Sequence, residues 1–355
     1  MMNRDESAEP GMTVVMPTRG NVAVVLKALA ALRAARDCLS PEIPVEFFMV
    51  DDSAQEDAAR LRAACDPARD EYYISGPRIV AQKRNIGARL GKYTYILFLD
   101  SDCIPVRSML DDHYRMLRCT RTAEGMPVGA ITGAIVAEEE ARDWFWKVTE
   151  FSTIFNAPNL WPLEYREVFW APADNLSMRR EVFEEIGGFH DEPFTVVGGE
   201  DVDICMKLRD AGYTITCIQK ALVYHSREPV AGFSDIARKM FTYGRSSVYN
   251  ASRQPHCQGW HANRITLSAG AVAAALLTGR RQPVRAAVAA VSGIWLWDAA
   301  RLMRQQRSLA PSLAVPAVAV EWIFDGGIVA EALRRKRPDC LVKRFRYFDQ
   351  SLFRR

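Results

Sequence analysis

The sequence predicts an α/β protein in which a sheet is flanked by helices, followed by a C-terminal helical appendage. Short apolar strands alternate with amphipathic helices over the first hundred residues, a pattern typical of a parallel sheet covered by helices. Polar and acidic residues follow directly after these strands. From about residue 251 onward, long apolar runs and a basic tail replace the alternation.

Four strands are expected in the first hundred residues, with helices between them. Each strand is an apolar run that ends at polar or turn residues, and each helix repeats apolar side chains three to four positions apart. Asn21 is expected to cap the first helix. The expected strands cover residues 13–16, 45–50, 72–74 and 95–99, and the later helices cover 56–64 and 79–90.

The second half of the chain is less regular. A helix is expected at 233–247, and its basic residues either reach donor phosphates or, as the favoured alternative, face water. A long loop is expected at 156–170, where prolines and aromatic residues interrupt any period. The other expected elements are helices at 108–118, 144–155 and 199–211, a strand at 128–136, an extended run at 170–178, and strands at 214–218 and 221–224.

The stretch YILFLDSDCIP at 95–105 is the first candidate site. A buried strand ends at Asp100-Ser101-Asp102, and Pro105 blocks its continuation. Ligands of open α/β sheets bind at the carboxyl ends of the strands. An Asp-x-Asp there is able to hold a divalent cation, which in turn holds a diphosphate. The alternative is a turn with two solvated carboxylates.

Three further positions are candidates for chemistry. Glu200 and Asp201 open a helix after Gly198-Gly199, so they either cap that helix or supply a general base. His225 ends a strand and is either structural or a metal ligand beside Asp102. Arg84, with Lys83, faces either a diphosphate or ordinary solvent.

Composition restricts the function classes. The 355 residues are 49% hydrophobic and 25% charged, as in ordinary globular proteins, with a net charge of +3. The segment 334–355 holds nine Lys/Arg and two Asp/Glu, which favours an anionic surface as partner, or else a solvated terminal helix. No nucleic-acid-recognition motif accompanies it, so no nucleic-acid partner is expected.

The remaining sequence features concern the compartment and the excluded motifs. Eight cysteines without a CxxC pair are expected to be reduced thiols of a cytoplasmic protein. Residues 1–12 are expected to form a loose leader, without the basic and apolar regions of a signal peptide. The dinucleotide fingerprint G-x-G-x-x-G, the P-loop and the H-E-x-x-H zinc motif are all absent from the sequence.

Seven stretches in order resemble the family 2 glycosyltransferases, which have the GT-A nucleotide-sugar-binding fold. The resemblance covers about residues 13–250, with a nucleotide-binding half at 13–105 and an acceptor and catalytic half at 106–250. The stretches are VVMPTRG at 14–20, MVDDS at 49–53, QKRNIGAR at 82–89, LFLDSD at 97–102, ADNLSMRREVFEEIGGF at 173–189, GGEDVDICMKLRDAGY at 198–213 and YHS at 224–226.

The resemblance implies a role for each matching residue. It implies a GT-A-type mixed sheet and an Mn²⁺ or Mg²⁺ cofactor held by Asp102 and His225. It implies Asp201 as catalytic base with Glu200 beside it. The nucleotide-sugar donor would contact Pro17, Thr18 and Arg19 at the base, Asp51 or Asp52 at the base or ribose, and Asp100 near the ribose. Arg84 would help to close the nucleotide site, and Asn175 would line the donor-sugar and acceptor side.

The implied activity is inverting, metal-dependent transfer of a sugar from a nucleotide-sugar, with UDP favoured as the carrier. The QxxRW signature of processive synthases is absent, so one or a few sugars would be added to a lipid, glycan, peptide or small-molecule acceptor. The second motif reads VDDSA rather than the commoner VDDGS. The alternatives are a nucleotidyltransferase and a catalytically inactive sugar-nucleotide-binding scaffold.

Residues 251–355 are expected to form a membrane-associated helical appendage at the cytoplasmic face of a membrane. Its apolar runs at 265–278, 284–297 and 309–328 fall short of a full span or carry charges. Three interpretations remain open: a helical hairpin that dips into or crosses the membrane, an interfacial helical appendage, and a soluble helical subdomain or dimer interface.

Overall fold

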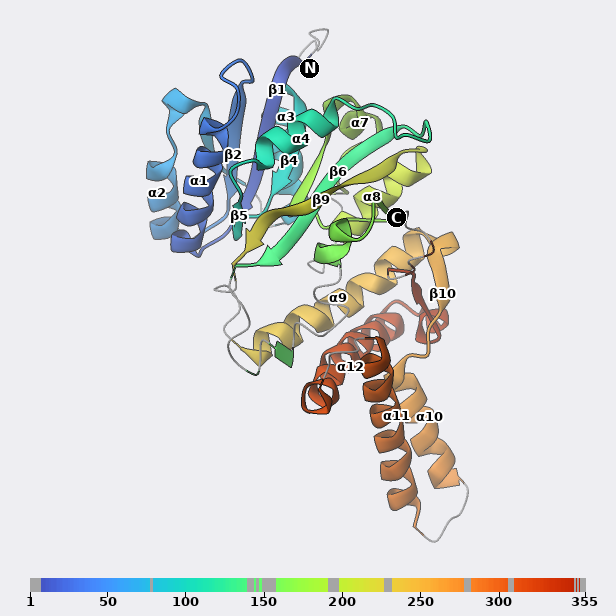
Figure 1. Cartoon of the computed structure of the whole chain (residues 1–355). Coiled ribbons are helices and arrows are strands. Elements are labelled where there is room, and N and C mark those ends of the chain that lie inside the picture. Colours follow the sequence, from blue (N-terminus) through green and yellow to red (C-terminus); the bar gives the residue numbers. More distant parts are fainter. Residues whose placement is uncertain are drawn as a thin grey trace.

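A nine-stranded mixed sheet forms the centre of the described part of the chain (Figure 1). The computed structural model describes residues 8–76, 79–138, 144, 147–148, 158–190, 198–226, 232–277, 282–305, 310–347, 349 and 351. The strand order is β3-β2-β1-β4-β8-β6-β9-β5, and β7 also pairs with β9. The strands are β1 Glu9–Thr18, β2 Val45–Asp51, β3 Glu71–Ser75, β4 Tyr93–Leu99, β5 Cys103–Pro105, β6 Val128–Ala137, β7 Glu167–Val168, β8 Asn175–Arg179 and β9 Thr214–His225.

Parallel and antiparallel pairing divides the sheet into two halves. Strands β1 to β4 pair in parallel, as the strand–helix alternation predicts. Strand β8 is antiparallel to both β4 and β6, so it joins the parallel β6–β9 pair to the first half. The predicted mixed sheet flanked by helices is therefore present.

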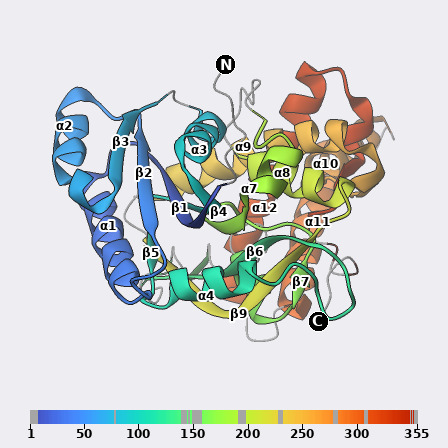
Figure 2. The same ribbon diagram turned by 90° about the horizontal axis from the view of Figure 1, so that it is seen from above.

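Helices cover both faces of this sheet, and each face has its own apolar core. One core receives α1 Val22–Asp37, α2 Gln55–Ala64 and α4 Met109–Leu117. The other receives α3 Val80–Leu90, α7 Arg180–Glu185 and α8 Glu200–Asp210. Figure 2 shows α4 and α3 on opposite sides of the strands.

Three local predictions differ from the structure. Asn21 has a left-handed backbone with φ of 46° and makes no capping side-chain hydrogen bond, so the predicted cap is wrong. The strands expected at 214–218 and 221–224 are one strand, β9, with an irregular register against β6. The loop expected at 156–170 contains β7 and a 3₁₀ turn, Trp161–Leu163. Most of the helix expected at 144–155 lies outside the described residues.

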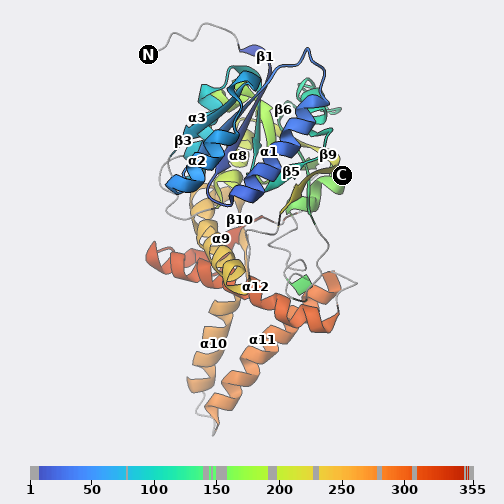
Figure 3. The same ribbon diagram turned by 90° about the vertical axis from the view of Figure 1, so that its left-hand side faces the viewer.

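The C-terminal elements are mostly helical. They are α9 Phe233–Arg253, β10 Gln258–Trp260, α10 Arg264–Leu277, α11 Pro283–Gln305, α12 Pro311–Arg334 and β11 Lys343–Phe345, with 3₁₀ turns at Pro255–Cys257 and Pro338–Leu341. Helices α10 and α11 project away from the sheet as a hairpin, and α12 crosses between this hairpin and α9 (Figures 1 and 3).

Helices α9 and α12 are in backbone contact. A Cβ placed at Gly244 would lie 1.9 Å from the Phe324 carbonyl oxygen, and one at Gly327 would lie 2.1 Å from the Phe241 carbonyl oxygen. Only glycine permits this approach. The chain then returns toward the sheet domain, where the Tyr347 carbonyl accepts a hydrogen bond of 3.0 Å from Trp170 Nε1.

Candidate functional site

The carboxyl ends of four strands and the start of a fifth meet at one edge of the sheet. Strands β1, β2 and β4 end there at Thr18, Asp51 and Leu99, in adjacent parallel strands. Antiparallel β8 starts at the same edge, with Asn175 opposite Leu99. Strand β9 also ends there, at His225, which faces Cys103 across the β5 pair. Residues far apart in the sequence therefore form one row of polar groups.

Asp51 is a fully buried carboxylate at the end of β2. Its Oδ2 accepts hydrogen bonds from the Ser53 amide at 3.0 Å and from the Tyr73 hydroxyl at 3.1 Å. The Ser53 hydroxyl also bonds to Asp51 and accepts from the Gly20 amide at 2.7 Å. Asp51 is thus held in a fixed orientation beneath the β1 loop.

Lys83 of α3 joins the ends of β1 and β2. Its ammonium donates to the Thr18 carbonyl at 2.7 Å and pairs with Asp52. Asp52 Oδ2 is buried and accepts no hydrogen bond from the described residues, and Arg19 Nε lies 4.0 Å from it. Pro17 precedes Thr18 in the same buried strand. The structure therefore brings together the predicted nucleotide residues of the first two motifs.

Arg84, also on α3, connects the end of β4 to the start of α8. Its guanidinium donates to Asp100 Oδ1 at 2.7 Å and to Glu200 Oε1 at 3.0 Å, and lies 5.4 Å from the Phe189 ring centroid. Burial lowers the pKa of Arg84, but the charges of Asp100 and Glu200 outweigh it and raise the pKa above the usual value. Arg84 faces carboxylates rather than solvent.

Asp102 and His225 lie side by side across the β5–β9 pair. The Ser226 amide donates to the Asp102 carbonyl at 2.8 Å, and His225 Nε2 lies 3.6 Å from Asp102 Oδ2. His225 Nδ1 lies 2.7 Å from the Ser226 carbonyl oxygen and donates a hydrogen bond to it, so Nε2 is the ring nitrogen that is left on the side of Asp102.

The donor set at this point fits a divalent cation. One ligand atom each from Asp102, Cys103 and His225 lies within 4.8 Å of the others. Burial raises the pKa of the Cys103 thiol well above its usual value, so that sulfur stays protonated and is a poor ligand. A carboxylate and an imidazole remain, a partial ligand set of the kind found in cation sites that are shared with a diphosphate.

Asp201 lies in the first turn of α8. Its Oδ1 accepts a hydrogen bond of 2.8 Å from the Val202 amide. Burial, followed by the nearby charge of Glu200, raises the pKa of Asp201 to about 7. A carboxylate with that pKa is poised to accept a proton near neutral pH.

The glycine pair before α8 is packed rather than free. Gly198 and Gly199 have φ of 98° and 95°, which other residues rarely adopt. A Cβ at Gly198 would lie 2.7 Å from the Tyr243 ring, and one at Gly199 would lie 2.9 Å from Asn250 Nδ2. Both neighbours belong to α9. The two glycines therefore allow α9 to pack directly against the start of α8.

Two residues of this site were missed by the sequence analysis. Asp174 precedes β8, next to Asp100, and its Oδ1 is buried without a hydrogen bond from the described residues. Burial, and then the charges of Asp100, Asp102 and Asp201, raise the pKa of Asp174 well above its usual value. Lys239 of α9 lies near the same cluster, with Nζ 5.8 Å from the Tyr243 ring centroid, and the charges of Tyr243, Asp102 and Asp174 raise its pKa. It does not simply face water.

Asn175 points away from this cluster. Its amide donates to the Gly133 carbonyl at 3.0 Å, and its Oδ1 lies 2.9 Å from Nε2 of His113 on α4. These contacts lie on the opposite face of the sheet from α8, and they occupy both ends of the amide. Successive side chains of an extended strand point to opposite faces of the sheet. Asp174 therefore lies on the face of the cluster, and Asn175 lies on the face that α4 covers.

Comparisons with known proteins agree with this arrangement. The family model described as "Glycosyltransferase like family 2" matches residues 31–248, more than half of the chain. The "Pre-mycofactocin glycosyltransferase" of Mycobacterium tuberculosis is 28% identical over 324 residues, covering 81% of this chain and 62% of that protein. "Glycosyltransferase AglE" of Haloferax volcanii is 24% identical over 264 residues, covering 74% and 78%. This chain thus spans less than two thirds of the mycobacterial relative.

A solved structure supports the fold. The mannosyltransferase PcManGT from Pyrobaculum calidifontis, solved with GDP-Man and Mn²⁺, superposes with a TM-score of 0.57 at 17% identity, over 94% of this chain and 90% of its own. The GT-A-type fold expected from the seven motifs is confirmed. With the family model and the relatives, it follows that this chain belongs to the family 2 glycosyltransferases.

Proposed function

We propose that the protein is an inverting, non-processive glycosyltransferase that uses a nucleotide-sugar and a divalent metal, with a UDP-sugar as the favoured donor. The observation that carries this proposal is that two carboxylates of the site stand on different elements and have different partners. Asp102 stands beside His225 at the end of β9, while Asp201, whose pKa is about 7, stands at the start of α8. In-line displacement needs a leaving-group site and a base on opposite sides of the sugar.

Asp201 is proposed as the base. Its carboxylate takes the proton of the acceptor nucleophile as that atom bonds to the anomeric carbon. The bond from the anomeric carbon to the phosphate oxygen breaks, and its electron pair leaves with the nucleoside diphosphate. Glu200 is held by Arg84, so its charge stays near Asp201 and supports the raised pKa that the base needs.

Asp102 and His225 are proposed to hold Mn²⁺ or Mg²⁺. Such a cation supplies stabilisation of the negative charge that develops on the leaving diphosphate. Lys239 adds a fixed positive charge on the same side, since it faces Asp102 and Asp174. The neighbouring mannosyltransferase structure contains Mn²⁺, which is consistent with this assignment.

The first two motifs are proposed as the nucleotide subsite. The Lys83 ammonium bonds to the Thr18 carbonyl and pairs with Asp52, next to the buried Asp51, and Asp52 Oδ2 has no hydrogen-bond donor in the described part of the chain. An acceptor oxygen of that kind suits a base N–H or a ribose hydroxyl. Pro17 and Arg19 are the chain neighbours of Thr18 in this subsite. Asp100 follows the neighbouring strand β4, and Arg84 of α3 bonds to it. These two residues would meet the ribose and diphosphate.

We further propose that residues 251–355 associate with the anionic cytoplasmic face of a membrane, and that 13–250 form the transferase domain. The basic segment 334–355 supports this, as do two helices, Pro283–Arg304 and Pro311–Arg334, that are long and apolar enough to cross a membrane. Such helices are also found in soluble proteins, so the association needs a vesicle-binding measurement.

The test is calorimetric titration of UDP, GDP and dTDP, each with and without Mn²⁺, into the wild type and Asp102→Ala. Tight, Mn²⁺-dependent binding of one nucleotide that Asp102→Ala abolishes is the expected result, and it names the carrier. If a folded sample binds none of them, the donor assignment is wrong and the scaffold alternative leads. Release of pyrophosphate during turnover would instead indicate a nucleotidyltransferase.

A further inference from the structure

The α10–α11 hairpin exposes apolar side chains over most of its length. After Arg264, α10 contains no charged residue. Its exposed residues include Leu267, Leu276 and Leu277, the last of them 85% exposed. Helix α11 adds a stripe of exposed residues, Val284, Val288 and Leu296, spaced four and eight positions apart, with Trp297 beside it. A helix that faced water would carry charged residues along that stripe.

Helix α12 differs from the hairpin, although it is the more apolar candidate. Half of its most apolar window is buried, against 22% for α11. Glu321 and Glu331 are buried in it and paired with Arg301 and Arg245. A helix that packs on α9 and carries paired carboxylates is a structural support and not a membrane span.

The length of the hairpin decides how it meets lipid. Arg264 opens α10, and Asp298 and Arg301 of α11 lie in a buried ion network at the same end. From Arg264 to Leu277 the helix is about 20 Å long at 1.5 Å per residue. The hydrocarbon core of a bilayer is about 30 Å thick. Arg285 near the far end of the hairpin would then stand at mid-membrane if the hairpin entered vertically.

We propose that the α10–α11 hairpin lies in the membrane interface, with its exposed apolar side chains among the upper acyl chains and Arg285 at headgroup depth. Neither α11 nor α12 crosses the bilayer. This inference rests on the membrane association proposed above and names the part that makes it. Lipid is favoured over a protein partner because the apolar residues occupy two helices that project from the body, and because the adjoining tail is basic.

The test measures depth at both ends of the hairpin. An environment-sensitive fluorophore is attached at Leu267→Cys or Leu277→Cys, in the full chain with Cys38→Ser and Cys119→Ser, and mixed with phosphatidylcholine–phosphatidylserine vesicles. The labels at both ends should brighten and be quenched more by shallow than by deep spin-labelled lipids. Leu90→Cys, on the sheet domain, should stay unchanged.

A matched pair of charge substitutions gives the second readout. Leu276 is 58% exposed and Leu90 is 56% exposed, so Leu276→Glu and Leu90→Glu are equivalent on the protein surface. Leu276→Glu should weaken vesicle binding roughly tenfold or more, and Leu90→Glu should not. Nucleotide binding should be the same in both, which verifies the fold.

The contrary outcomes are distinct. A Leu277 label quenched best by deep lipids, or reached only from the vesicle lumen, would mean that the hairpin crosses. Vesicle binding without any change in either hairpin label would overturn this inference and leave the association. No vesicle binding at all would overturn both. Dimers in sedimentation that Leu276→Glu dissociates would show a second copy as the occupant.

Discussion

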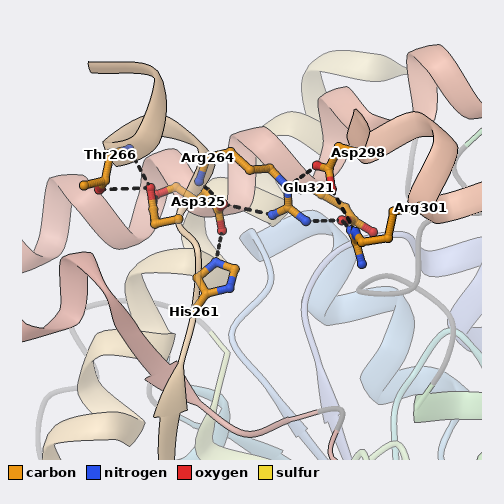
Figure 4. Close-up of polar contacts among 8 residues, drawn as sticks. His261, Arg264, Thr266, Asp298, Arg301, Glu321 and Asp325 are labelled. Atoms are coloured by element: carbon orange, nitrogen blue, oxygen red, sulfur yellow. Dashed lines mark hydrogen bonds and ion pairs between the residues drawn. The ribbon is translucent and has the colours of Figure 1, made fainter. Parts of the chain in front are cut away.

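Two clusters of buried charge in this protein differ in how their carboxylates are paired. In the C-terminal helices, Arg264 pairs with Asp298, Glu321 and Asp325, and Arg301 pairs with the first two of these (Figure 4). His261 completes this network at 2.8 Å from Asp325. At the sheet edge, acidic groups outnumber the cations that reach them, and Asp174 Oδ1 lacks a hydrogen bond from the described residues.

The difference separates architecture from function. A buried carboxylate that has its cation is part of the packing, and removing the cation is costly. A buried carboxylate that is surrounded by other carboxylates is unfavourable in the free protein, and its arrangement is explained by a ligand or a reaction. The sheet-edge cluster therefore marks the site, and the network in Figure 4 marks the support.

The largest effect is expected at the sheet edge. Asp201→Asn removes the proposed base and should lower kcat by roughly 10²–10⁴-fold, while donor binding stays within a few-fold of wild type. Single-turnover kinetics and calorimetry of the donor nucleotide separate the two effects. Turnover close to wild type in Asp201→Asn would refute the assignment of the base.

The paired network should respond through stability. Arg264→Met leaves Asp298, Glu321 and Asp325 without their shared cation and should destabilise the protein by about 3–5 kcal/mol. Urea unfolding monitored by circular dichroism measures this change. Arg285→Met, on the exposed part of α11, is the matched control and should cost little.

Asp174→Asn is expected to change stability in the opposite direction. This substitution puts a neutral amide where burial and the charges of Asp100, Asp102 and Asp201 oppose ionisation of the carboxyl, so it should raise the free energy of unfolding at pH 7 by roughly 1–3 kcal/mol. It should also weaken nucleotide-sugar binding more than binding of the bare nucleotide, if Asp174 contacts the sugar. Equal loss for both ligands would show that it acts on the diphosphate side.

The pH dependence of the reaction gives the smallest effect. Because the pKa of Asp201 is raised to about 7, its carboxyl is protonated below that pH, and kcat should fall about tenfold per pH unit there. The same raised pKa means that the folded protein holds this proton more tightly than the unfolded chain. Asp201 therefore costs stability as pH rises from about 4 through 7, and Asp201→Asn should remove that cost.

Much of the site was predictable from the sequence. Apolar runs that end in carboxylates correctly placed Asp51 and Asp100 at strand ends, because strand length and turn chemistry are local properties. The order of the seven motifs also indicated a mixed sheet, which the structure confirms. These features are written in short stretches of sequence.

Other features depended on packing between distant elements. The family resemblance pointed to Asn175 and not to Asp174, and only the position of α4, with His113 against Asn175, showed that Asp174 is the one that faces the site. Lys239 lies more than a hundred residues from Asp102, and α9 brings it there because α12 and the two glycines of 198–199 hold that helix in place.

The sequence by itself determined the strands, the acidic strand ends and the family, since these follow from local periodicity and short motifs. The tertiary structure alone decided which charges are paired and which are left to a ligand. Charge balance depends on distances across the fold, and Arg264 or Arg84 acquires its partners only when separate helices meet. For the same reason, only the fold distinguished the supporting α12 from the exposed α10–α11 hairpin.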